Sequence, residues 1–213
     1  MIVYNPVDGE AITSGVKSAP RCCFLMTRLG KPIDPGVTAI RDAVIERCIN
    51  HGYTVIDAST KVTGRDFLVK IWRQIASVPL AIGVCHEGIP AKTQFNIYYE
   101  LGVAQAMGKE TVLIKSEKAE VPSDFVRTEY IRFDGDFSVT FDAFMTQLTV
   151  VAEHYEQMAD QLDRNPVLAL DYFRRAFLIT GDARLQRKAK KLLTSAGLGA
   201  RAKNSVELLA ASF

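Results

Sequence analysis

The residues best suited to chemistry lie at positions 95–109, which read FNIYYELGVAQAMGK. Asn96 and Glu100 are four residues apart, so in a helix they share one face. A carboxylate held in a crevice can act as a nucleophile or stabilise an oxocarbenium-like centre, as in the cleavage of glycosidic bonds. An acidic residue in the first turns of a helix also has a purely structural explanation, because it complements the helix dipole.

The elements around this segment predict a parallel sheet. Short apolar segments typical of buried strands alternate with amphipathic helical patterns; they lie at residues 21–27, 53–57, 80–85, 111–114 and 130–133. This alternation predicts right-handed βαβ units and a sheet with helices on both faces. With five strands, we expect the flavodoxin-like order 2-1-3-4-5.

A fold of this class also indicates where a ligand binds. In such sheets, ligands bind outside the carboxyl ends of the strands, at the switch point between the first and third strands. That rule selects the loops after Thr27, Asp57 and Cys85, and the start of the helix that we expect over residues 96–107. The free N–H groups at a helix N-terminus suit a phosphate or an anionic intermediate.

The pattern N-x-x-Y-E-L-G-x-A-x-A-x-G-K, followed by an apolar strand, resembles the nucleoside 2-deoxyribosyltransferase-like and TIR-like group. The first strand with Phe24-Leu25-Met26-Thr27, the helix leading into Gly52-Tyr53 and the acidic end of the second strand at Asp57 fit in the same order, over residues 21–136. The resemblance implies cleavage or transfer at the N-glycosidic bond of a nucleoside, nucleotide or NAD. Glu100 matches the position of the family's catalytic glutamate. NAD would then be a substrate, and no metal or redox cofactor is implied.

The resemblance and the strand-end rule together give a set of candidate binding residues. We expect base, ribose and phosphate to be placed by Thr27, Arg28, Asp57, Asn96 and Tyr99. Arginine suits bidentate contact with phosphate, and an aspartate at a strand end suits a ribose hydroxyl. Each also has an ordinary explanation, such as a helix cap for Asn96 or a turn for Asp57.

The sequence departs from the family's pattern in the loop after the third strand. Deoxyribosyltransferases usually present an aspartate there, whereas this loop reads Cys85-His86-Glu87-Gly88, so Glu87 or His86 would have to substitute. Hydrolysis, or nucleotide binding without turnover, therefore stays open beside transfer. If the chain binds a nucleotide without turnover, it would be a sensing module that signals through its helical extension.

The pattern changes after Asp136 and predicts helices to the end of the chain. An apolar stripe at helical spacing runs over residues 141–162. Asn165-Pro166 begins a second helix that Gly181 closes, and Asp182 caps a third that ends at Gly197. We therefore predict an N-terminal arm over 1–20, an α/β domain over 21–136 and a helical C-terminal extension over 137–213.

The net charge of +2 over 213 residues conceals an uneven distribution. Residues 164–203 carry ten Lys and Arg against two Asp, a net charge of +8, which leaves −6 for the rest. Such a block can bind nucleic acid or another acidic partner, dock on the acidic body of a second copy, or simply form a solvated helix face. The stripe over 141–162 has more apolar surface than one helical hairpin covers, which favours a homo-oligomer.

Composition excludes several other classes. Hydrophobic residues make up 48% and charged residues 23%, which are ordinary values for a globular protein. No apolar run reaches the roughly 18 residues of a membrane span, and residues 1–20 lack the apolar core of a secretory signal. The four cysteines show no CxxC spacing. We therefore expect free thiols, no membrane partner and a cytoplasmic location.

Overall fold

The computed structural model describes residues 16–58, 67–122, 130–162 and 164–195. The chain divides into two compact units. The first, here called the sheet unit, covers Cys22–Met145. The second, here called the helical unit, combines Met1–Arg21 with Thr146–Phe213. Each unit is described by itself.

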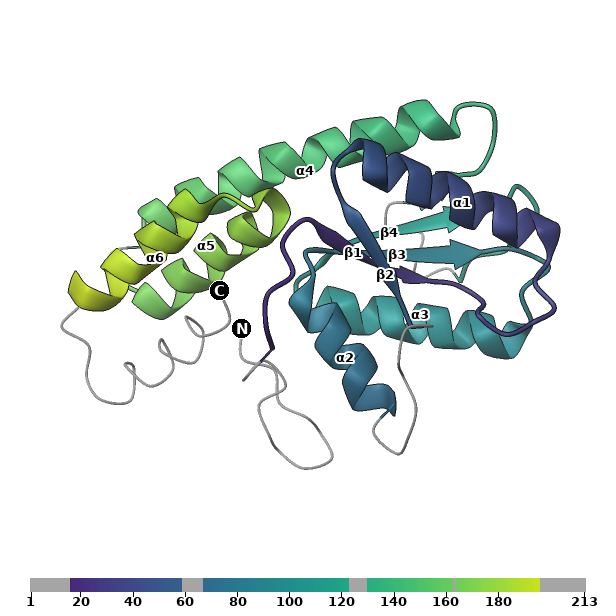
Figure 1. The fold of residues 1–213 in the computed structure, drawn as a ribbon, viewed down its shortest axis with the longest axis horizontal. Helices are drawn as coiled ribbons and strands as arrows, with labels where there is room; N and C mark the ends of the chain where they lie inside the picture. Colours follow the sequence, from purple (N-terminus) through teal and green to yellow (C-terminus); the bar gives the residue numbers. More distant parts are fainter. Residues whose placement is uncertain (1–15, 59–66, 123–129, 163, 196–213) are drawn as a thin grey trace. The chain divides into compact units, whose positions relative to one another are not determined.

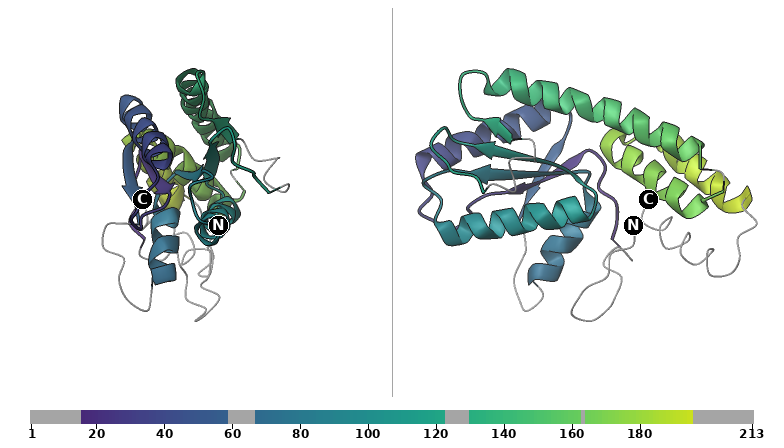
Figure 2. Two further views of the ribbon diagram at one scale, coloured as in Figure 1. Left: turned by 90° about the vertical axis from the view of Figure 1, so that its right-hand side faces the viewer. Right: turned by 180° about the vertical axis from the view of Figure 1, so that it is seen from behind.

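The sheet unit contains five parallel strands in the order β2-β1-β3-β4-β5. The strands are β1 (Cys22–Met26), β2 (Thr54–Asp57), β3 (Leu80–Cys85), β4 (Glu110–Lys115) and β5 (Tyr130–Arg132). Helices α2 (Phe67–Ser77) and α3 (Ala91–Ala106) cover one face, and α1 (Pro35–Asn50) covers the other (Figure 1). The view from behind shows the same layers (Figure 2). This is the flavodoxin-like arrangement that the alternating pattern predicts.

The apolar character of the strands follows from helices on both faces. β3 lies in the middle of the sheet and is buried at all six positions. On its neighbour β1, Phe24 and Leu25 are at most 1% exposed. A strand covered on both sides has no solvent face, so it reads as a continuous apolar run rather than an alternating one.

Helix α3 begins earlier than the sequence predicts. Its first residue is Ala91, and Pro90 is the N-cap without a side-chain hydrogen bond. The predicted start at Asn96 is wrong, because residues 91–94 lack apolar periodicity although nothing in them opposes a helix. Asn96 therefore lies in the second turn and Glu100 in the third. Neither can use the free N–H groups or the dipole of the helix N-terminus, whose effect fades within the first turn.

A glycine on β3 lets α3 lie close to the sheet. A Cβ added at Gly83 would lie 2.5 Å from Cδ1 of Leu101 and 3.1 Å from Cγ2 of Ile97. At the far end of α3, Gly108 takes a left-handed φ of 67°, and Lys109 donates a hydrogen bond of 2.8 Å to the Ala76 carbonyl. Gly108 and Lys109, the last two residues of the 95–109 segment, thus form a turn that is hydrogen-bonded to the end of α2.

The helical unit follows the predicted capping signals. Helix α4 (Phe137–Asp160) runs from the sheet unit into it, and α5 (Pro166–Thr180) and α6 (Ala183–Ser195) follow. The Asn165 side chain accepts a hydrogen bond from the Leu168 N–H, and Gly181 closes α5 with a φ of 72°. Asp182 accepts from the Arg184 N–H at 2.8 Å at the start of α6. The predicted end of α6 at Gly197 lies outside the described residues.

The apolar stripe along α4 is covered. Phe141, Met145, Leu148 and Ala152 are at most 3% exposed, and no described member of the stripe is fully exposed. The expectation that this stripe leaves spare apolar surface for a homo-oligomer is therefore wrong. A homo-oligomer itself stays a prediction.

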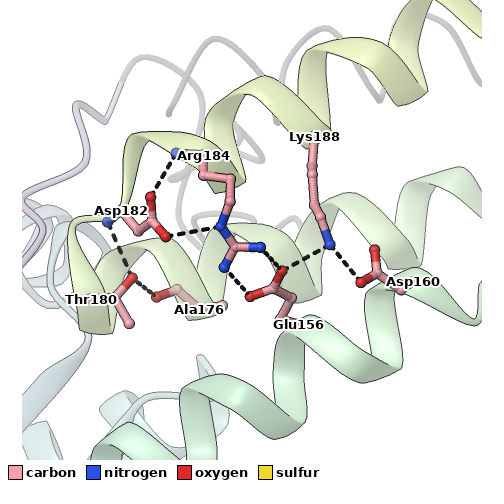
Figure 3. A network of polar contacts seen from close by, with 7 residues as sticks. All are labelled: Glu156, Asp160, Ala176, Thr180, Asp182, Arg184 and Lys188. Atoms are coloured by element: carbon pink, nitrogen blue, oxygen red, sulfur yellow. Dashed lines mark hydrogen bonds and ion pairs between the residues drawn. The ribbon is translucent and has the colours of Figure 1, made fainter.

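Four of the ten basic residues of the block 164–203 form ion pairs or are buried inside the helical unit. Arg184 pairs with Glu156 and Asp182, and Lys188 pairs with Glu156 at 2.8 Å and Asp160 at 2.6 Å (Figure 3). Two more members have internal positions: Arg175 binds Asp171 at 3.0 Å, and Arg174 is only 5% exposed. Counting charge along the sequence missed this pairing because Glu156 and Asp160 precede the block.

We expect Glu156→Gln to lower the free energy of unfolding by about 1–2 kcal/mol at pH 7, because Arg184 and Lys188 then share a neutral amide. The hydrogen bond from Arg184 lowers the pKa of Glu156. Its stabilising contribution is therefore present above the ordinary pKa and is lost as the pH falls through the lowered one. Urea unfolding measures the difference, with Glu153→Gln, an exposed position on the same helix, as the control. If both variants lose the same free energy of unfolding, the ion pairs of Glu156 with Arg184 and Lys188 do not stabilise the helical unit.

Candidate functional site

A cavity of about 180 Å³ opens at the carboxyl end of β1, between that strand and α3. Thr27, Asn96 and Glu100, three of the predicted site residues, line it. The remaining lining is mostly apolar and consists of Phe24, Leu25, Met26, Leu29, Ala58, Ile71, Thr93 and Ile97. The cavity thus lies where the switch-point rule places a ligand, on the side of the sheet that α2 and α3 cover.

Glu100 projects into this cavity from the third turn of α3. Burial raises the pKa of its carboxyl group to about 7. Within the described part of the chain no salt bridge neutralises the carboxylate. Near pH 7 both protonation states are populated, which suits a group that must attack, stabilise or exchange a proton in turn.

Thr27 brings an unsatisfied hydroxyl to the same cavity. The residue is 8% exposed, and its Oγ1 is buried without a hydrogen-bond partner among the described residues. Leaving a buried hydroxyl unpaired costs about 1–3 kcal/mol. A polar atom kept in this state at a cavity wall is well placed to bind a polar group of a ligand.

Thr93, Asn96 and Glu100 form a polar column along α3. Their spacings of three and four residues place them on one side of the helix, and all three line the cavity. Asn96 is exposed, whereas Thr93 and Glu100 are half-buried, so the column offers polar groups both at the mouth of the cavity and in its wall. Sequence reasoning missed Thr93, although the spacing was visible, because the helix was expected to start after it.

Four predicted site residues do not line the cavity. Arg28 donates from Nε to the Gly30 carbonyl at 3.0 Å in the loop after β1. Asp57 pairs with Arg41 at 3.4 Å and borders a separate hollow of about 790 Å³ between α1 and the β2 edge. Tyr99 is 52% exposed on the outer side of α3. Glu87 is the fourth.

Glu87 and His86 have other contacts in the loop after β3. The Ser116 hydroxyl donates a hydrogen bond to Glu87, and this bond lowers the pKa of the Glu87 carboxyl group. His86 is 9% exposed, and its Nδ1 accepts a hydrogen bond of 2.8 Å from the Gly88 N–H. Its ring lies against the start of α1, where a Cβ at Gly36 would come within 2.4 Å of Nε2. Neither side chain takes the place of an aspartate in the cavity.

The directions of side chains in strands and helices explain why some of the predicted site residues do not line the cavity. Successive strand residues point to opposite faces, so Asp57 meets Arg41 of α1 while Ala58, the next residue, lines the cavity. Successive helix residues turn by about 100°, so Tyr99 faces away from the side that carries Glu100. Proximity in sequence therefore does not place two side chains in one site.

The described residues contain no group of three or more His, Cys, Asp or Glu side chains that could hold a metal ion. Cys22, Cys23, Cys48 and Cys85 are free thiols, and the Cys23 and Cys48 sulfurs lie 3.7 Å apart. Among the helices described, none has the length and apolar character to cross a membrane.

Two of the solved structures that resemble part of this chain are enzymes. One is a 2-deoxyribosyltransferase from Bacillus psychrosaccharolyticus, with 12% identity, a TM-score of 0.40, and 53% of this chain and 85% of that chain covered. The other is a CMP N-glycosidase from Clostridium botulinum, with 19% identity, a TM-score of 0.40, and 57% of this chain and 98% of that chain covered. No family model and no curated protein sequence matches the chain. The fold class above rests on the observed strand order.

We expect Gly83→Val to lower the free energy of unfolding by about 1–3 kcal/mol, because the added side chain must displace Leu101 in a filled core. Since α3 carries Glu100, the same change should disturb the cavity. Urea unfolding measures the first effect. Gly135→Val is the control, because a Cβ there meets nothing within 4 Å. An undiminished stability in Gly83→Val would show that close packing of α3 on β3 is not required.

Proposed function

We propose that this chain cleaves or transfers at the N-glycosidic bond of a nucleoside or nucleotide, NAD included, and that Glu100 supplies the essential carboxylate. The observation that carries the proposal is the pairing, in one cavity, of the half-buried Glu100 carboxyl with the unpartnered Thr27 hydroxyl. The resemblance of residues 95–109 to the deoxyribosyltransferase-like pattern supports it.

The chemistry follows from the charge that develops when the bond to the base breaks. The sugar acquires oxocarbenium character, and a carboxylate beside it stabilises that charge or attacks it to form a glycosyl intermediate. Water then completes hydrolysis, or a second base completes transfer. In this proposal the Thr27 hydroxyl and the Asn96 amide bind sugar hydroxyls and orient the ring.

The size of the cavity favours a sugar inside it. At about 180 Å³ it is smaller than the roughly 300–1,000 Å³ of pockets that enclose drug-sized ligands. A pentose would fill it and leave the base, or a phosphate, at the mouth. None of the lining residues is Lys or Arg, so an uncharged part of the substrate suits the interior.

A base-release assay tests the proposal. The purified chain is incubated with NAD and with a panel of nucleosides and 5′-nucleotides, singly and with a second free base, and released base is separated by chromatography. Release of one base, with or without exchange, is the expected result. If no compound is cleaved or exchanged and none binds in calorimetry, the proposed function is wrong.

Binding without turnover is the second candidate, and the loop after β3 favours it. Neither Glu87 nor His86 reaches the cavity, so the family's usual aspartate has no substitute there. A nucleotide that binds, remains intact and protects the chain against unfolding would establish this sensing role. Nucleic-acid binding through residues 164–203 has less support, because Arg175, Arg184 and Lys188 form ion pairs inside the helical unit.

A further inference from the structure

The hollow between α1 and the edge of the sheet, here called the β2 hollow, is separate from the candidate site. Its volume is about 790 Å³, and it shares no lining residue with the cavity that contains Glu100. The lining consists of residues 52–57 together with Arg41, Ile45 and Ile49 of α1. The hollow therefore follows the whole length of β2, and its volume is within the roughly 300–1,000 Å³ of ligand sites.

The strand that borders this hollow is an edge strand, because β1 is its only neighbour in the sheet. An edge strand presents N–H and C=O groups on its outer side, and proteins commonly protect them with a very short strand, a proline or a charged side chain. The other edge, β5, has such protection, since it has three residues and ends in the exposed Arg132. β2 contains neither proline nor lysine, and the one charged side chain, that of Asp57, pairs with Arg41 at 3.4 Å. The outer side of β2 is therefore suited to pairing with another extended chain.

The walls of the hollow are apolar. Val55 lies two residues before Asp57 and so on the same face of the sheet, the face on which Asp57 pairs with α1. On α1, Ile45 is half-buried, and Ile49, one turn further along the helix, is 60% exposed. A strand added beside β2 would place every second side chain between these residues and cover them.

Charge indicates which kind of chain fits. Asp42 and Glu46 are exposed on α1 and lie seven and three residues before Ile49, so they adjoin the hollow on the helix surface. Among the described residues that line the hollow or adjoin it on α1, three carboxylates, these two and that of Asp57, stand against one guanidinium, that of Arg41. The hollow of a second copy has the same negative rim and would repel this one, as would nucleic acid. A chain with lysine or arginine would be attracted.

We propose that the β2 hollow binds an extended, basic segment of another protein, which adds to the sheet as a strand beside β2. Alternate aliphatic side chains of the segment enter the hollow against Val55 and Ile49. Lysine or arginine residues that flank them extend past the apolar walls to Asp42 and Glu46. The proposal concerns a protein partner and does not depend on the proposed function.

A defined peptide tests the charge requirement. Fluorescein-labelled KTVTVTK carries two valines on one face of a strand with lysines on either side, and fluorescence anisotropy follows its binding. We expect saturable binding to the wild type, and Asp42→Lys with Glu46→Lys to raise the dissociation constant about tenfold or more. The matched control is Glu117→Lys with Glu120→Lys, an equal change of net charge at exposed positions after β4, two strands away from β2. The peptide ETVTVTE should bind the wild type about tenfold more weakly than KTVTVTK.

Two further comparisons test the apolar wall and the strand pairing. Ile49→Ser should weaken binding several-fold, whereas Val139→Ser, which changes a 73% exposed apolar residue of α4, should not. Since N–H groups of successive strand residues point to opposite edges, N-methylation of the valines blocks one edge of the peptide and N-methylation of the threonines blocks the other. One of these two isomers should therefore lose binding and the other keep it.

Several results would overturn the proposal. They are no binding at about 1 mM peptide, equal effects of the two pairs of lysine substitutions, and equal affinities of the two methylated isomers. A wild-type dimer in sedimentation velocity that Ile49→Ser dissociates would assign the hollow to a second copy and would overturn it as well. All of these outcomes are read without measuring base release, so they are separate from the fate of the proposed function.

Discussion

Replacing Glu100 by glutamine is expected to lower the rate of base release at least about 10³-fold, because an amide can neither attack nor carry the negative charge that stabilises an oxocarbenium-like centre. The side chain keeps its shape, so the substrate should still bind, and KM should change far less than kcat. Initial rates on the best substrate of the panel give both constants.

Glu46→Gln is the matched control for that experiment. Glu46 is an exposed residue of α1, so it undergoes the same chemical change without altering the cavity. Its rate should equal that of the wild type. If Glu100→Gln releases base as fast as the control, the carboxylate is not needed and the catalytic part of the proposal is wrong. Calorimetry on Glu100→Gln with intact substrate then separates lost binding from lost turnover.

Much of the fold was predictable because its signals are local. Each buried strand reads as an apolar run, and each helix shows periodic apolar residues, with caps such as Asn165-Pro166 and Gly181 where the chain turns. The order of the strands then follows from the handedness of βαβ units. The start of α3 was missed because Ala91 and its neighbours offer neither periodicity nor a side-chain cap.

The site was predictable only in part because it depends on the direction of side chains. The motif and the strand-end rule correctly selected Thr27, Asn96 and Glu100, which line one cavity. Asp57 and Tyr99 are equally near in sequence, but the pleat of β2 and the turn of α3 direct them elsewhere. The catalytic and binding roles of the three remain proposals that the assays above address.

The pKa of Glu100 also has a consequence for stability. In the unfolded chain a glutamate titrates near 4.5, whereas burial in the folded state raises the pKa of Glu100 to about 7. Between these values the folded state binds more protons than the unfolded state, so the free energy of unfolding falls as the pH rises. At 1.36 kcal/mol per pKa unit the full loss, reached above pH 7, is up to about 3 kcal/mol.

Glu100→Gln is therefore expected to be more stable than the wild type by up to about 3 kcal/mol at pH 8, and to lose this advantage below about pH 4.5, where both side chains are neutral. Urea unfolding at intervals between pH 4 and pH 8 measures the difference, and Glu46→Gln should follow the wild-type curve throughout. An advantage that does not grow with pH would show that burial does not penalise the ionised Glu100. Together with the activity assay, a variant that gains stability as it loses turnover would show that the chain keeps a costly buried carboxylate for its chemistry.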